Sequence, residues 1–457
     1  MAHPGYNPDG GEAELSATRR ELVAEQLRQE IRDRILAPGS VLSETGIARR
    51  LGVSPTPVRE AFHELLWDGW LQVRDGHRRV TILTTTESRD FFELISRLLA
   101  LCLDKAADQP DPPPPDRNAE VVRRFVHNLQ DGDYRAARYA QRDYVDAVGA
   151  VADDHLLART VQDLAALSRA VDVHRIDATP DTWLIAMQHL VEPFERADFR
   201  TAARVMNEDR ALFLADIDQR WAGLSSTSTA GHPEHDETHR PTMPDDVQDS
   251  EPDNITATVT RRLRSEILTG ELSPGTPLRE RSVARSRKVS ATPVREAFWQ
   301  LAAEALLEPR RGGGQQVSRP GPEDAAELLD FATGISALTV EWLIERFTGA
   351  TGRSEIAEQF IRAADDWLHA PYRAAALERE LTNRIARQVG NMGLIRLVRR
   401  SQLMATPAAV SLPPAAAARW SNSTRLVGQH LSTGRTDEAV LLLRTRAAGL
   451  RQDSAPR

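Results

Sequence analysis

The chain has 457 residues, of which 41% are hydrophobic and 27% are charged, and its formal net charge is −8. These values are typical of soluble globular proteins with about three to four domains, and no apolar run approaches the ~20 residues that cross a bilayer. The acidic balance argues against bulk coating of nucleic acid, although a local basic face can still bind it. The single cysteine, Cys102, excludes an intramolecular disulfide and indicates a buried thiol in a reducing cytoplasm.

The chain begins with an expected disordered tail, residues 1–17, followed by a first domain at 18–84. The stretch RQEIRDRIL predicts an amphipathic helix with Leu27, Ile31 and Ile35 on one side. Next, SETGIARRLG predicts a short helix that Ser43 can cap and that ends at Gly52.

The string SPTPVREAF then predicts a third helix. Thr56 can cap this helix with Pro57 at its first position, where the missing N–H costs nothing. Arg59 and His63 are expected to point away from a buried face formed by Val58, Ala61, Phe62 and Leu65. The two short helices, joined by Gly-Val-Ser, predict a helix-turn-helix whose second helix can enter a major groove N-terminus first. The alternation of WLQVRDGHRRVTIL around Asp75-Gly76 predicts a basic two-stranded hairpin that can reach phosphates or the minor groove.

Residues 85–222 carry apolar residues at helical spacing and almost no strand signal, interrupted by an expected stiff loop, DQPDPPPPDR, at 108–117. Residues 223–254 are poor in apolar residues and rich in Pro, Ser, Thr and acids, which predicts a flexible acidic linker.

The first domain then recurs. SATPVREAF, which starts at Ser290, matches SPTPVREAF in eight of nine letters at a spacing of 236 residues. The same offset relates Leu27 to Leu263 and Pro38-Gly39 to Pro274-Gly275, so we infer a duplication with a second such domain at 255–319 and a second helical region at 320–451. The expected fold is mainly α: two winged helix-turn-helix domains, each followed by an all-helical effector-type bundle.

The repeated domains are locally basic. Residues 18–83 hold 11 arginines against 9 acids, a net of +2, and residues 255–319 hold 12 basic residues against 6 acids, a net of +6. A basic face on an otherwise acidic chain is what docking to DNA requires.

The string LGVSPTPVREAFHELLWDGWLQV resembles the winged helix-turn-helix of the GntR family of bacterial transcription regulators. The helical regions resemble the all-helical effector (FCD) domain of its FadR-like branch. The resemblance implies a sequence-specific DNA-binding regulator, expected to be a repressor, with a double-stranded operator as partner. We call the two winged domains the first and second readers, and the regions at 85–222 and 320–451 the first and second helical halves.

The resemblance also implies the reading residues. In the first reader they would be Ser54, Thr56 and Arg59, with Gly76 and His77 at the wing. In the second reader they would be Arg281, Ser290, Thr292 and Arg295, with the wing tip Gly312-Gly313-Gly314. Arg59 and Arg295 are the best candidates for contacts to guanine, worth ~1–3 kcal/mol of discrimination each, whereas hydroxyls at a helix start more often touch phosphates.

The readers also depart from the family pattern. Pro55 and Ala291 stand where an arginine is usual, and another usual arginine is Thr45 in the first reader but is kept as Arg281. The turn glycine Gly52 becomes Lys288, at a cost of ~1 kcal/mol if the turn is left-handed.

FadR-like effector domains often hold a metal through one Asp and three His, but neither helical half keeps such a set. The corresponding positions are Gln141, Val145, Met187 and Asp209 in the first half and Glu378, Thr382, Thr424 and Arg446 in the second. We expect no metal and no cofactor, and His155, His189 and His430 are expected to be ordinary histidines. A pocket for a small-molecule effector stays open as an alternative to a purely structural role.

Duplication predicts the mechanism. Family members usually dimerise on palindromes, whereas this chain carries both readers and a linker of about 30 residues that spans about 30 Å. We therefore expect intramolecular pairing of the halves, a pseudo-dimer, on an imperfect palindrome.

Two alternative functions stay open. An enzyme is disfavoured because no nucleophile, phosphate loop or carboxylate pair stands in a plausible frame, and the lost arginines favour a scaffold or antagonist that does not bind DNA.

Overall fold

The computed structural model describes residues 19–171, 181–227, 255–310, 313–346 and 350–447. The chain divides into two compact units, Met1–Thr81 and Ile82–Arg457. The expected tail at 1–17 and residues 228–254 of the expected linker lie outside the described residues. Within the described ranges, every helix is too short or too polar to cross a membrane.

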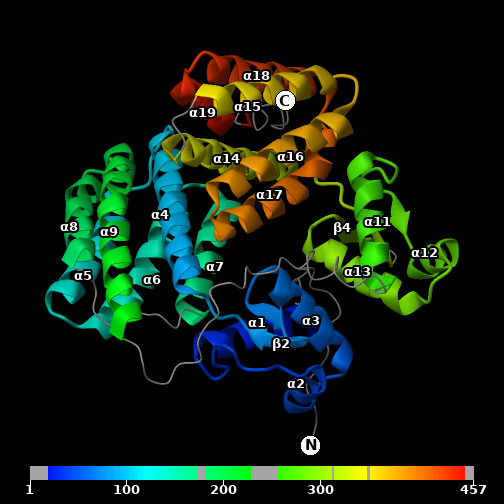
Figure 1. The fold of residues 1–457 in the computed structure, drawn as a ribbon, viewed down its shortest axis with the longest axis horizontal. Coiled ribbons are helices and arrows are strands. Elements are labelled where there is room, and N and C mark those ends of the chain that lie inside the picture. The colour runs from blue at the N-terminus through cyan, green and yellow to red at the C-terminus, as the bar shows by residue number, and fades with distance from the viewer. Residues whose placement is uncertain (1–18, 172–180, 228–254, 311–312, 347–349, 448–457) are drawn as a thin grey trace, which may run out of the picture. The chain divides into compact units, whose positions relative to one another are not determined.

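The mainly α fold with two winged helix-turn-helix domains is confirmed (Figure 1). The first unit holds the first reader. Its elements are α1 (Arg19–Arg32), α2 (Glu44–Leu51), α3 (Pro55–Trp67), β1 (Leu71–Arg74) and β2 (His77–Val80).

The core of the first reader forms where α1 and α2 pack against α3. Leu27 and Ile31 of α1 are fully buried, as are the predicted core residues of α3, Val58, Ala61, Phe62 and Leu65. Ile35 was expected to extend this apolar side, but it is 67% exposed. The helix ends at Arg32, and Arg34 adopts a left-handed backbone (φ 61°) that turns the chain before Ile35.

The caps of α2 match the sequence. The Ser43 hydroxyl accepts a hydrogen bond from the Gly46 N–H, and Gly52 ends the helix in the left-handed conformation (φ 67°). The cap of α3 was predicted two residues too late, at Thr56. Ser54 is the N-cap residue, Pro55 is the first helical residue, and Thr56 and Pro57 lie inside the first turn. Because none of the first four N–H groups of a helix has an intrahelical partner, the first turn tolerates both prolines, and the sequence could not fix which one starts it.

The predicted wing hairpin is confirmed. Strands β1 and β2 pair in antiparallel register from Leu71–Val80 to Arg74–His77. Asp75 and Gly76 between them both have positive φ (53° and 73°), as a two-residue type I′ turn requires.

The second unit contains the first helical half, the second reader and the second helical half. The first helical half consists of α4 (Thr85–Ala107), α5 (Pro115–Gln130), α6 (Tyr134–Ala150), α7 (His155–Val171), α8 (Asp181–Glu195) and α9 (Phe199–Thr227). The second reader consists of α11 (Ile255–Thr269), β3 (Pro277–Leu278), α12 (Glu280–Arg287), α13 (Ala291–Ala303), β4 (Leu307–Pro309) and β5 (Gln315–Val317). The second helical half consists of α14 (Pro322–Arg346), α15 (Ala350–Asp366), α16 (Pro371–Val389), α17 (Met392–Val410), α18 (Pro414–Ser432) and α19 (Thr436–Thr445).

Two expected boundaries in the first helical half need correction. The proline-rich loop was expected through residue 117, but α5 begins at Pro115, because a proline whose φ already suits a helix is favoured at the first helical position. The helical half was expected to end at 222, but α9 continues to Thr227 before the described residues stop. Ser225 and Ser226 carry no signal strong enough to end a helix.

The second reader repeats the elements of the first, and the Val41–Arg79 bridge of the first reader corresponds to the β3–β5 pairing of the second. Lys288 ends α12 in the left-handed conformation (φ 57°). The turn is therefore left-handed, and the strain of ~1 kcal/mol expected for a residue other than glycine applies to Lys288. The wing is a three-stranded sheet in which β5 pairs with both β3 and β4.

The two helical halves pack against each other within the second unit. Helix α4 contacts α17, its counterpart α14 contacts α7, and α4 and α14 also contact each other. Buried side chains of both halves form one continuous apolar cluster that includes Leu94, Leu98 and Cys102 with Ile335 and Leu338. Cys102 is buried, which confirms the expected buried thiol, and burial raises the pKa of this thiol.

Ion pairs border this contact. Arg97 of α4 lies 2.6 Å from Glu345 of α14 and stacks on the Trp342 ring, 4.2 Å from its centroid. Lys105 of α4 lies 2.5 Å from Asp330 of α14. These charges need partners because Arg97 is buried and Lys105 nearly so.

Candidate nucleic-acid interface

The predicted reading residues of the first reader lie at two places, the start of α3 and the wing tip. Ser54 and Thr56 are exposed at the start of α3, and the Arg59 side chain one turn later is 37% exposed. Gly76 and His77 are exposed at the tip, where the Asp75 carbonyl lies 2.6 Å from the His77 Nδ1. In a helix-turn-helix, the N-terminal residues of the second helix are the ones that reach base edges.

The second reader presents the same residue types at equivalent places. Ser290 and Thr292 are exposed at the start of α13, and the Arg295 side chain is 47% exposed. Arg281 is exposed in the first turn of α12. Gly313, at the wing tip, is exposed and has a φ of 93°, whereas Gly312 lies outside the described residues.

The starts of both recognition helices suit an anion. The Ser54 and Ser290 side chains make no capping hydrogen bond to their own helices, in contrast to Ser43, which caps α2. Pro55, Pro57 and Pro293 have no N–H, so the N–H groups left without a cap in these first turns include those of Thr56 and Thr292, and the helix dipole adds a partial positive charge there. A phosphate is the ligand that such a helix start accommodates.

Two glutamates that sequence reasoning did not single out hold the candidate arginines. The Arg59 Nε donates to Glu44 Oε2 at 3.0 Å, and the Arg295 Nε donates to Glu280 Oε2 at 2.9 Å. Each pair spans 15 residues, so the identical spacing in the two repeats was the signal that could have identified them. In the first reader the wing joins this contact, because Arg78 Nη1 lies 2.6 Å from Glu44 Oε1.

The positions that the family resemblance assigned to a metal do not fit one in the second helical half. Glu378, Thr424 and Arg446 do converge, but as an ion pair: Arg446 Nη2 lies 2.7 Å from Glu378 Oε2, and its Nη1 lies 3.0 Å from the Thr424 hydroxyl. The guanidinium also stacks on the Trp420 ring, 4.0 Å from its centroid. A buried cation of the protein itself therefore stands among these groups, which leaves a divalent ion neither charge nor space.

The first helical half differs at the same positions. Val145 and Met187 are buried and apolar, and Asp209 pairs with the half-exposed His189 at 3.0 Å. No group of three or more His, Cys, Asp or Glu side chains suited to a metal occurs in the parts of the chain that the structure describes.

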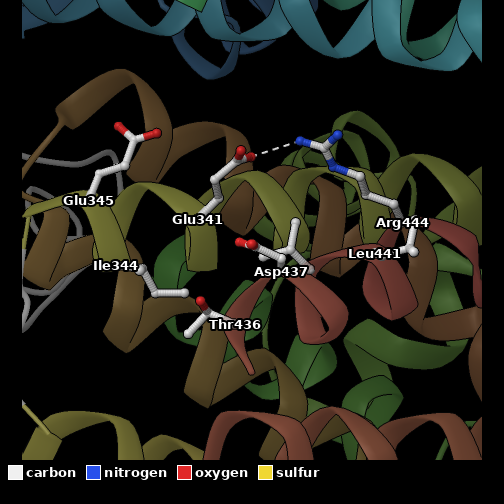
Figure 2. A pocket seen from close by; sticks show the side chains of 8 residues that line it. Glu341, Ile344, Glu345, Thr436, Asp437, Leu441 and Arg444 are labelled. Carbon is white, nitrogen blue, oxygen red and sulfur yellow. Dashed lines mark hydrogen bonds and ion pairs between the residues drawn. The ribbon is translucent and has the colours of Figure 1, made fainter. Parts of the chain in front are cut away.

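A cavity of about 360 Å³ opens between α14 and α19 in the second helical half (Figure 2). The aliphatic side of its lining consists of Ile344, Val440 and Leu441, and the polar side consists of Thr436 with Glu341, Glu345, Asp437 and Arg444. Arg444 is paired with Glu341 at 2.8 Å and also with Asp104 of the first helical half at 2.6 Å. The cavity thus borders the contact between the two helical halves.

The comparisons with known proteins concern mainly the readers. Residues 19–79 and 255–317 both match the family model "Bacterial regulatory proteins, gntR family". The chain is similar, at 38% identity over 73 residues, to a Paenarthrobacter nicotinovorans protein named "Probable D-xylose utilization operon transcriptional repressor", with 16% of this chain and 32% of that protein covered. It is also 44% identical over 66 residues to a Streptomyces ambofaciens protein named "Uncharacterized HTH-type transcriptional regulator in unstable DNA locus", with 14% and 28% covered.

The chain thus spans about a third of the length of the curated relatives it matches. Among solved structures it is similar to the E. coli protein McbR/YncC, at 18% identity and a TM-score of 0.36, over 45% of this chain and 99% of that chain. The two matches to the family model identify both readers as winged helix-turn-helix domains of the GntR type.

Proposed function

We propose that this chain is a sequence-specific transcriptional regulator that binds DNA as a single-chain pseudo-dimer, with one reader on each half of an imperfect palindrome. The observation that carries the proposal is the repeated geometry of the readers. Each presents an arginine one turn into a recognition helix whose start is exposed, and each arginine is held by a glutamate at the same spacing.

The proposed contacts follow from the chemistry of the groove. A guanidinium matches the two acceptors of guanine in the major groove, so we assign Arg59 and Arg295 to base recognition. Ser54, Thr56, Ser290 and Thr292 lie at the helix starts, where hydroxyls and N–H groups suit phosphates. The wing tips, with His77 in one reader and Gly313 in the other, are assigned to the adjacent backbone or minor groove.

Pairing of the helical halves supports the single-chain mechanism. Contacts of α4 with α17 and of α14 with α7 are reciprocal, as in an isologous dimer interface, although both partners here belong to one chain. The shared apolar cluster and the Arg97–Glu345 pair give this contact the character of a permanent interface. The unequal readers in turn favour an imperfect rather than a symmetric site.

A mobility shift with DNA from upstream of the protein's own gene tests the proposal. The wild-type chain is expected to shift this DNA, and Arg59→Ala and Arg295→Ala should each weaken specific binding by ~1–3 kcal/mol, about 5- to 150-fold. Arg362→Ala, which changes an exposed arginine of α15, is the matched control and should bind as the wild type does. Absence of any specific shift would favour the rival role of a scaffold or antagonist.

The oligomeric state needs a separate measurement. Light scattering on the free protein should give the mass of one chain, because each chain already contains both members of the helical interface. An assembly that always contains two chains would contradict the single-chain mechanism without affecting the assignment of the readers.

We assign the place of a small-molecule effector to the cavity between α14 and α19. Two of its lining residues, Glu345 and Arg444, also pair with Arg97 and Asp104 of the first helical half. Occupancy would therefore alter the pairing of the halves, and through it the spacing of the readers. A panel of small carboxylates and amines, screened for a shift in thermal melting, tests this. A shift that Leu441→Trp abolishes by filling the cavity supports the assignment, and no shift from any compound contradicts it.

A further inference from the structure

The glutamates beside the candidate reading arginines have no assigned role. Glu44 opens α2 and Glu280 opens α12, so both lie on the helix that precedes the recognition helix. Their carboxylates accept hydrogen bonds from the Nε atoms of Arg59 and Arg295 at 3.0 and 2.9 Å. The same atom pairing in two domains that diverge elsewhere indicates a requirement rather than an accident of the surface.

Stability does not account for this repetition. Both arginines are more than a third exposed, and Glu280 is 35% exposed, whereas Glu44 is 16% exposed. In the second reader water reaches both partners, and an ion pair of this kind contributes little to folding, yet the pair is kept there. A carboxylate beside a DNA-binding face also repels phosphates, so its retention in both readers needs another explanation.

Positioning of the arginine side chains explains why both readers keep the glutamate. An arginine side chain has many rotamers, and a carboxylate that binds its Nε from the protein side reduces them to those that direct the guanidinium along the recognition helix. We propose that Glu44 and Glu280 are positioning residues that preorganise Arg59 and Arg295 for one base pair each and discourage binding elsewhere. This inference rests on the proposed DNA-binding function.

The first reader adds a second link. Glu44 binds Arg59 through Oε2 and Arg78 of the wing strand through Oε1. The register of the hairpins pairs Val80 with Leu71 and Val317 with Leu307, which places Gln315 of the second reader where the first has Arg78. Glu44 therefore ties the recognition helix to the wing, whereas the wing strand of the second reader has no arginine at this position. We expect the loss of Glu44 to have the larger effect.

The test compares Glu44→Gln and Glu280→Gln in the full chain, with binding measured on the operator and on an unrelated duplex. Loss of positioning should weaken operator binding by about threefold to tenfold for Glu44→Gln and less for Glu280→Gln. Removal of a negative charge should strengthen binding to the unrelated duplex by about twofold. Glu64→Gln, which changes a glutamate on α3 that pairs with Arg28, is a control for charge alone.

A double-mutant cycle separates positioning from a structural role. In the Arg59→Ala background, Glu44→Gln should cause no further loss of base preference at the affected position, and thermal melting should stay within a degree or two of the parent. Tighter operator binding by Glu44→Gln would overturn the inference, because it would mean that the glutamate withholds the arginine from DNA. An equal loss with and without Arg59 would also overturn it. If the wild-type chain binds no operator, the proposed function fails instead.

Discussion

The two halves of this chain share one order of elements, but they differ in the turns and wings of the readers and at the centres of the helical halves. In the readers, the buried face of α3 returns in α13, where Val294, Ala297, Phe298 and Leu301 are as inaccessible as their counterparts. The turns and wings that surround these cores differ, with Gly52 against Lys288 and Arg78 against Gln315. The contacts that fold the domain have thus been retained in both copies, whereas the turn before the recognition helix and the wing strand have diverged.

The helical halves show the same contrast more strongly. The centre of the second contains a buried ion pair, Arg446 with Glu378, beside Thr382 and Thr424, whereas the first has the apolar Val145 and Met187 in place of those two threonines. Substitutions in the two centres should cost different amounts of stability. Removing one partner of a buried ion pair leaves a charge without a partner, which costs more folding free energy than shortening an apolar side chain. The predictions that follow are ordered from the largest expected effect to the smallest.

The largest difference between the halves is expected for Arg446→Ala. This change leaves Glu378 buried without its cation and should lower the free energy of unfolding by about 3–5 kcal/mol. Asp209→Ala, at the corresponding position of the first half, removes a pair with the half-exposed His189 and should cost about 1 kcal/mol or less. Urea denaturation of both variants measures the contrast, and equal losses would show that the two centres are not energetically different.

The contact between the halves should depend on pH through Asp90. Burial, together with the nearby Glu93, raises the pKa of the Asp90 carboxyl to about 6, against the lowering effect of the Met392 N–H and of Arg346 and Arg89. Because the folded protein holds this proton more tightly than the unfolded chain, the contribution of Asp90 is present below about pH 4 and is lost as the pH rises to about 6.

Asp90→Asn keeps an acceptor for the Met392 N–H and removes the charge, so we expect it to stabilise the protein by about 2 kcal/mol at pH 7.5 and to change little at pH 4. Thermal melting of the variant and the wild type across this range provides the measurement. Stabilisation that is the same at both pH values would point to packing rather than to titration.

The readers can be made more alike by Thr45→Arg. Thr45 is exposed in the first turn of α2, where the second reader has Arg281. A new arginine beside the groove should tighten operator binding by about 1 kcal/mol, or about fivefold, and should extend protection on the half-site of the first reader. Footprinting would show this extension, and unchanged protection would mean that this position does not face DNA.

The smallest expected effect distinguishes the two turns. Lys288 has a left-handed backbone, so Lys288→Gly should stabilise the second reader by about 1 kcal/mol. Gly52→Ala should destabilise the first reader by a similar amount, because Gly52 has a φ of 67°. Nothing lies within 4 Å of where its Cβ would be, so the cost is backbone strain alone. Chemical denaturation of the two variants tests the opposite signs.

The sequence predicted the readers well because their signals are local. The cap at Ser43, the turn at Asp75-Gly76 and the buried face of α3 each depend on a few neighbouring residues, and all three agree with the structure. The start of α3 was misplaced because two prolines compete for one turn. Family resemblance proposed Arg59 and Arg295 as reading residues, but only the fold brings Glu44 and Glu280 to their Nε atoms.

The long-range contacts could not be predicted from the sequence. Nothing local in Arg97 or Glu345 indicates that they pair across 248 residues, and the convergence of Glu378, Thr424 and Arg446 into one buried network depends on how three helices pack. The sequence did show that the metal-ligand set was missing. It placed Arg446 at one of those positions but could not show that this arginine pairs with Glu378.

The most direct test of the account is the stoichiometry of the operator complex, combined with the footprint of each reader. We predict one chain per duplex with two protected half-sites, where Arg59→Ala weakens protection of one half-site and Arg295→Ala weakens the other. Two chains per duplex, or loss of the same half-site with both variants, would contradict the claim that one polypeptide reads both halves of its site.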